Sequence, residues 1–70
     1  MTLTINGEDR DFTSVTTLSE LISQLGMKAD RVAIELNRNL VRRDQWSDTK
    51  LSNGDNLEIV HFVGGGAQCP

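Results

Sequence analysis

The chain has 70 residues, which is enough for one small domain with a thin margin of stability. Ten acidic and seven basic residues give a net charge of −3 at pH 7, and the basic ones are scattered apart from the neighbours Arg42 and Arg43. This argues against nucleic acid as a partner, because nucleic-acid binders concentrate lysine and arginine. The arginine pair is most simply a solvated turn.

The single cysteine, Cys69, excludes an internal disulfide, and one thiolate does not make a structural zinc site or hold an iron–sulfur cluster. A single cysteine is typical of a protein in a reducing, cytoplasmic setting. No apolar run approaches the length of a membrane span, and no signal-peptide pattern is present. We therefore expect a cytoplasmic protein with no membrane partner, no metal site and no bound cofactor.

The first pattern along the chain is a hairpin. Residues 2–6 alternate polar and apolar side chains, which is the period of a half-buried strand. Asn6 and Gly7 form a two-residue hairpin signal, because both tolerate positive φ. The return segment, residues 8–12, is so polar that we place it at a sheet edge, where charges discourage unwanted pairing.

A short, one-sided helix follows. Thr17 and Glu20 have the spacing of a capping box, in which the two side chains cover free backbone amides. Gly26 ends the helix in the left-handed conformation, so we expect about ten residues lying across a sheet. Apolar residues at i, i+3, i+4 and i+7 share its buried face: Leu18, Leu21, Ile22 and Leu25.

Two strands come next. Residues 31–37 alternate again, with Val32, Ile34 and Leu36 on one face. We expect a turn at Arg38 and Asn39 and then a short strand at residues 40–41.

The remaining chain is predicted to finish the sheet. Residues 43–48 form a loop or a single helical turn, and Trp46 there is expected to be a lid on the core rather than a ligand platform. A turn at residues 53–55 precedes the last strand, residues 56–63. The polar edge strand leaves the first strand free to pair in parallel with the last. The predicted fold class is α+β, a β-grasp of order β-β-α-β-β-β in which one helix crosses a mixed sheet.

The last strand has two unlike faces. Leu57, Ile59, His61 and Val63 share one, and Glu58, Val60 and Phe62 share the other. Because only one helix is available as cover, we expect the second face to be exposed and to form a partner-docking surface. The alternative is a central strand buried on both sides. His61, the only histidine, is expected to be partly buried and hydrogen-bonded, since it has no evident catalytic partner.

Three glycines, Gly64, Gly65 and Gly66, follow that strand. Composition alone is compatible with a disordered tail. The alternative is a thin, extended arm, reaching about 10 Å, that enters a narrow channel and delivers a terminal carboxylate. It is not a phosphate-binding loop, because no Gly-Lys-Ser/Thr motif is present.

Several segments resemble the ThiS family of sulfur carriers in thiamine biosynthesis. They are residues 4–8, 33–37, 54–55 and above all 58–66, which read EIVHFVGGG. The resemblance runs from residue 2 to residue 66. It implies a ubiquitin-like β-grasp domain over residues 1–63, related to MoaD, the small subunit of molybdopterin synthase.

The resemblance also implies a carrier that is a substrate of partner enzymes and not itself an enzyme. A ThiF/MoeB-like adenylating enzyme, using ATP and magnesium, would activate the carboxylate of Gly66, and Gly64 and Gly65 would pass through its channel. A sulfur donor would convert the acyl-adenylate into a thiocarboxylate. Thiazole synthase would then take the sulfur.

The chain departs from the family at its end. ThiS-like chains normally stop at the glycine, whereas here residues 67–70 follow, so Gly66 is held in an amide bond to Ala67. We hypothesise a precursor that a peptidase cleaves between Gly66 and Ala67. Two rival explanations are residues left over from recombinant expression, and an independent role for Cys69 as an exposed thiol that forms mixed disulfides or a linked dimer.

Two other functions remain open at this point. The sulfur could be destined for another pathway, such as molybdopterin, cysteine or siderophore synthesis. Alternatively, the chain could be a non-covalent β-grasp interaction module, such as a regulatory or tRNA-associated domain. Such a module would tolerate alanine at Gly65, whereas a carrier that threads a narrow channel would not.

Overall fold

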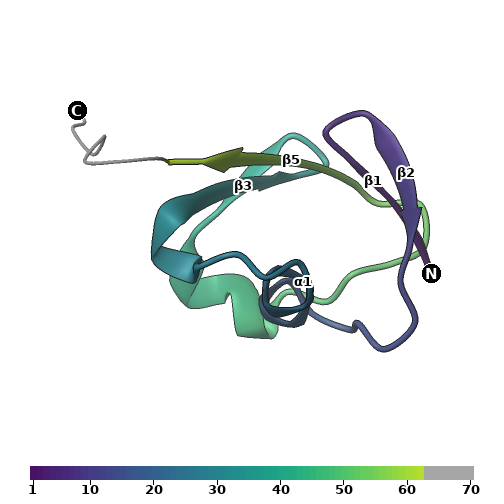
Figure 1. Cartoon of the computed structure of the whole chain (residues 1–70), viewed down its shortest axis with the longest axis horizontal. Helices are drawn as coiled ribbons and strands as arrows, with labels where there is room; N and C mark the ends of the chain where they lie inside the picture. Colours follow the sequence, from purple (N-terminus) through teal and green to yellow (C-terminus); the bar gives the residue numbers. More distant parts are fainter. Residues whose placement is uncertain (63–70) are drawn as a thin grey trace.

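The computed structural model describes residues 1–62 as a five-stranded sheet with one α-helix across it (Figure 1). The expected glycine arm and the residues after it lie outside this range, so the proposed division of the chain into domain, arm and extension stays a prediction. The strands are β1 (Thr2–Ile5), β2 (Glu8–Asp11), β3 (Val32–Leu36), β4 (Asn39–Val41) and β5 (Asn56–His61). The helices are α1 (Leu18–Gln24) and two 3₁₀ helices, η1 (Ala29–Arg31) and η2 (Arg43–Asp48).

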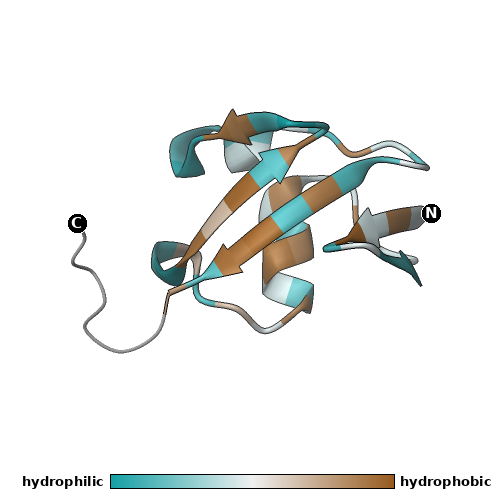
Figure 2. Cartoon of the chain, turned by 90° about the horizontal axis from the view of Figure 1, so that it is seen from above, coloured by the Kyte–Doolittle hydropathy of each residue, from teal (hydrophilic) through white to brown (hydrophobic). Residues whose placement is uncertain are grey.

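The strand order is β2-β1-β5-β3-β4. β1 and β5 are parallel, with Ile5 opposite Leu57, and the other neighbours are antiparallel. The predicted edge position of β2, the parallel pairing and the mixed sheet are therefore confirmed. α1 covers one face, and Figure 2 views the sheet from the opposite side, with α1 behind the strands.

The β1–β2 hairpin turns where the sequence predicts. Asn6 and Gly7 have φ of 51° and 85°, the pair of positive values that a tight two-residue hairpin requires. Every residue of β2 is exposed. The Thr4 hydroxyl on β1 donates to the Asp9 carboxylate at 2.7 Å, so this polar edge is tied back to its neighbour by side chains as well.

Both ends of α1 are capped. The Glu20 amide donates to Thr17 Oγ1 at 3.2 Å, and the Glu20 carboxylate accepts from the Thr17 amide, which confirms the capping box. At the other end Gly26 has φ of 76°, and the Met27 amide donates to the Ile22 carbonyl, the pattern of a glycine-terminated helix. The helix has seven residues rather than about ten, because the segment from Thr17 to Gly26 includes the caps. Within residues 1–62, no helix has the length and apolar character needed to cross a bilayer.

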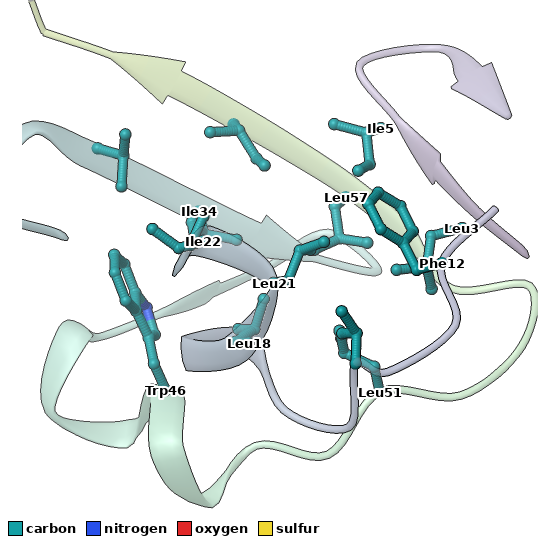
Figure 3. Close-up of a cluster of buried hydrophobic side chains, with 13 residues drawn as sticks. Leu3, Ile5, Phe12, Leu18, Leu21, Ile22, Ile34, Trp46, Leu51 and Leu57 are labelled. Atoms are coloured by element: carbon teal, nitrogen blue, oxygen red, sulfur yellow. The ribbon is translucent and has the colours of Figure 1, made fainter. Parts of the chain in front are cut away.

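The core lies between α1 and the covered sheet face (Figure 3). Trp46 on η2 is 3% exposed, and its indole N–H donates to the Val41 carbonyl at 3.0 Å, which confirms it as a buried lid whose polar atom is satisfied. The other buried apolar residues are Leu3, Ile5, Phe12, Val15, Leu18, Leu21, Ile22, Val32, Ile34, Leu51, Leu57 and Ile59.

The turn between β3 and β4 lies one residue earlier than predicted. The residues with positive φ are Asn37 (50°) and Arg38 (74°), and β4 already begins at Asn39. The reason is that β5 holds Asn37 in place. The backbone N–H of Asn37 donates to the Asn56 carbonyl at 2.7 Å, and the side-chain Oδ1 of Asn37 accepts from the backbone N–H of Asn56. A local turn pattern in the sequence does not indicate such long-range contacts.

Candidate functional site

The two faces of β5 differ as predicted. Leu57 is fully buried and Ile59 nearly so, whereas Val60 is 57% and Phe62 45% exposed. Glu58 is exposed beside them. The cause is the single helix α1, which covers only one face of the sheet, the face on which Leu57 lies (Figures 1 and 3). The outward orientation of Glu58, Val60 and Phe62 is therefore confirmed, and their role in docking stays a prediction.

His61 is exposed, so the expectation of a partly buried histidine was wrong. His61 pairs with Val32, the first residue of β3, at the end of the sheet where β5 runs past α1 (Figure 1). His61 thus lies on the same face of β5 as Leu57 and Ile59, but α1 does not cover this end of the strand. The Phe62 amide still donates to the Arg31 carbonyl at 2.7 Å, so backbone pairing extends one residue beyond β5.

The uncovered face is wider than β5 alone. Ala33 lies opposite Val60, and Leu40 on β4 lies opposite Glu35 and is 69% exposed. We call the uncovered side chains of β3, β4 and β5 the outer face: Ala33, Glu35, Leu40, Glu58, Val60 and Phe62. A shallow hollow of about 270 Å³ lies here, and all of these except Phe62 line it. Sequence reasoning missed Leu40, although its alternation with the half-buried Val41 was a usable signal.

Two asparagines fix the position of β5. Beyond the end of β1, the Asn6 side chain continues the pairing, because its Oδ1 accepts from the Ile59 amide at 2.7 Å and its Nδ2 donates to the Ile59 carbonyl at 3.0 Å. On the opposite side of β5, Asn37 binds both backbone groups of Asn56. Asn6 was predicted to form a turn, and Asn37 lies in the turn between β3 and β4. Both residues also hold the strand that carries the candidate docking residues.

Asn6 provides the first testable prediction. Asn6→Gly keeps the positive φ accessible but removes the amide, leaving two part-buried backbone groups of Ile59 without partners. We expect the free energy of unfolding to fall by about 1–3 kcal/mol. Urea denaturation measures this. Asn6→Asp should also be less stable, because a carboxylate cannot donate to the Ile59 carbonyl; wild-type stability of both variants would contradict the assignment.

The predicted modified residue Gly66, the arm residues Gly64 and Gly65, and the cleavage site between Gly66 and Ala67 lie outside the described residues. The structure does describe the strand that leads toward them, up to Phe62. Within residues 1–62, no three histidine, cysteine, aspartate or glutamate side chains gather into a possible metal site.

Comparison with known proteins identifies the family. A sequence model described as the ThiS family matches residues 3–66, which is nearly the whole chain. The chain belongs to the ThiS family. The sulfur carrier protein ThiS of Bacillus subtilis is 32% identical over 65 residues, covering 91% of this chain and 98% of that protein. The crystal structure of the thiamine biosynthesis protein ThiS from Geobacter metallireducens has a TM-score of 0.78 at 33% identity, covering 94% of this chain and 100% of that one.

Other relatives of this ThiS-family chain are much longer. It is 40% identical over 67 residues to a protein named thiazole synthase from Paramagnetospirillum magneticum, and 37% identical over 70 residues to one from Magnetococcus marinus. These matches cover 96% and 100% of this chain but only 21% and 22% of the relatives, so the chain spans about a fifth of their length. The second match includes residues 67–70.

Proposed function

We propose that this ThiS-family chain is a sulfur carrier for thiamine biosynthesis, and that the carboxylate of Gly66, once exposed, becomes a thiocarboxylate. The observation that carries the proposal is the extent of the family match, which runs through the whole domain and up to Gly66, the third glycine. Its relatives from Bacillus subtilis and Escherichia coli are both named sulfur carrier protein ThiS.

The chemistry requires a partner enzyme. A carboxylate is a poor electrophile, because its oxygen is a poor leaving group. A ThiF/MoeB-like enzyme with ATP and magnesium would join the Gly66 carboxylate to AMP and release pyrophosphate. A sulfur donor at the level of hydrosulfide would then attack the acyl carbon, AMP would leave, and loss of the S–H proton would give the thiocarboxylate. In this scheme the chain is the substrate and carrier, and the catalytic groups belong to its partners.

Thiazole synthase is the acceptor that the relatives favour. In two bacteria a segment like this chain occurs within a much longer protein named thiazole synthase. Joining two proteins in one chain raises the effective concentration of each at the other. A carrier and its acceptor gain from such a link, because the carrier must present its terminus to the acceptor in every cycle.

We assign docking to the outer face. Val60 and Phe62 expose large apolar side chains beside Glu58, on the strand that leads into the glycines. Such an exposed apolar group is typical of a protein-interaction surface. Contact here would hold the adenylating enzyme at one end of β5, while Gly64 and Gly65 extend toward its active site.

The decisive experiment compares the chain ending at Gly66 with the 70-residue chain. Each is incubated with the adenylating enzyme, ATP, magnesium and a sulfur donor, and intact mass is measured. We expect only the shorter chain to gain the mass of an oxygen-to-sulfur exchange, because only there is the carboxylate of Gly66 free. Absence of the exchange in the shorter chain, with a known ThiS protein reacting in parallel, would contradict the proposal.

Release of Gly66 requires cleavage before Ala67. We propose that a peptidase removes residues 67–70; the match to the Magnetococcus marinus protein extends over these residues as well. Mass spectrometry of the protein purified from its native cells tests this step. Detection of only the uncut chain while thiamine is being made would contradict it.

A further inference from the structure

Two glutamates lie side by side on the outer face. Glu35 on β3 and Glu58 on β5 are direct partners in the antiparallel register. Residues opposite each other in this way have Cβ atoms about 5 Å apart, and like charges at such positions destabilise a sheet. A like-charged pair therefore needs an explanation other than the stability of the isolated domain.

Within residues 1–62, neither glutamate has a compensating partner. The ion pair found in that range joins Arg42 to Asp44, and no side-chain hydrogen bond involves Glu35 or Glu58. Both carboxylates are exposed. Their mutual repulsion in the free protein is screened by solvent and salt.

The pair lies in an apolar setting. It belongs to the hollow of about 270 Å³ on the outer face, together with Ala33, Leu40 and Val60. Leu40 flanks Glu35 on the side away from Glu58, and it is the most exposed large apolar side chain of the described chain at 69%. A partner that covers these apolar groups would also remove water from the carboxylates, so it must supply a positive charge at this point.

We propose that the Glu35–Glu58 pair binds an arginine side chain of the adenylating enzyme, and that the surrounding apolar side chains pack around it. This inference rests on the proposed function. The guanidinium group fits because its planar fork of donors can serve two neighbouring carboxylates at once, and because it is more weakly hydrated than the lysine ammonium. A second copy of this chain does not fit, because face-to-face pairing would bring four carboxylates together.

The inference predicts effects of opposite sign on stability and on binding. Glu35→Gln/Glu58→Gln removes the repulsion, so the free domain should melt no lower than wild type, and above it at low salt. The same change removes the charges that the partner recognises. We expect the Kd for the adenylating enzyme to rise about tenfold or more, and the salt dependence of binding to weaken.

The test uses the chain ending at Gly66, which retains every described residue, and the ThiF/MoeB-like enzyme of the same organism. Titration calorimetry gives Kd at low and high salt, and thermal unfolding gives the melting temperature. Glu8→Gln is the control for a charge change elsewhere on the sheet, because it removes one negative charge from β2 at the far edge. It should bind like wild type.

The outcomes separate the inference from the proposed function. If wild type is adenylated but the double variant binds equally well, or melts below wild type, the inference is overturned and the carrier function stands. If wild type neither binds nor is adenylated, the proposed function fails and the inference falls with it. Carbodiimide joins carboxylates to lysine amines but not to guanidinium groups, so a cross-link from Glu35 or Glu58 to an enzyme lysine would overturn the assignment to arginine.

Discussion

Replacing Gly65 by leucine in a chain that ends at Gly66 is expected to slow adenylation about 100-fold while leaving docking intact. The proposed arm has no side chains at three successive positions, and a channel matched to bare backbone has no space for an isobutyl group. A side chain that shifts the terminal carboxylate by about 1 Å from its reacting position is expected to slow the reaction about 100-fold. Pyrophosphate release measures the rate.

Docking provides the internal control for this variant. The outer face is unchanged by the substitution, so the variant should still compete with wild type for the adenylating enzyme. Gly65→Ala should fall between wild type and the leucine variant, because a methyl group is the smallest addition. Full activity of the leucine variant would show that the glycines do not enter a narrow channel.

The second prediction with a large effect concerns stability, and it compares substitutions on the two faces of β5. Leu57 is fully buried between β1 and β3, next to Ile5 and Leu36. Leu57→Ala should lower the free energy of unfolding by about 2–5 kcal/mol, from lost burial and the cavity left behind. In a domain of this size such a loss removes most of the stability. Urea denaturation followed by Trp46 fluorescence measures it.

Val60→Ala is the matched variant on the outer face, three residues along the same strand. Because Val60 is 57% exposed, its truncation should change stability by no more than about 0.5 kcal/mol. Its effect should appear in docking, and Val60→Ala/Phe62→Ala should weaken binding to the adenylating enzyme further. A Val60 variant as unstable as the Leu57 variant would show that the outer face is part of the core.

Local patterns were sufficient for most of the fold. The capping box at Thr17 and Glu20 and the asparagine–glycine turn at Asn6 act within a few residues, so their geometry can be read from spacing. The parallel pairing of β1 with β5 was predictable because the polar β2 leaves one side of β1 free. The β3–β4 turn was placed one residue late because the backbone of β5 holds Asn37, and that contact joins distant parts of the chain.

The candidate site was predictable only in part. The alternation of β5 indicated that Glu58, Val60 and Phe62 point away from the core. It could not indicate where the cover of α1 ends, so His61 was wrongly expected to be partly buried. The Glu35–Glu58 contact depends on the register between β3 and β5, which a single sequence does not specify for strands with similar alternation.

The parallel pairing of β1 with β5 has a mechanical consequence. The chain enters the sheet at the start of β1 and leaves it at the end of β5, so these two points lie at opposite ends of the paired strands. Tension between them loads the bonds from Thr4 to Asp55, from Asn6 to Leu57 and from Asn6 to Ile59 together, in shear, instead of opening them one by one. The pairing of β1 with β5 should therefore resist a pull applied between the start of β1 and the end of β5.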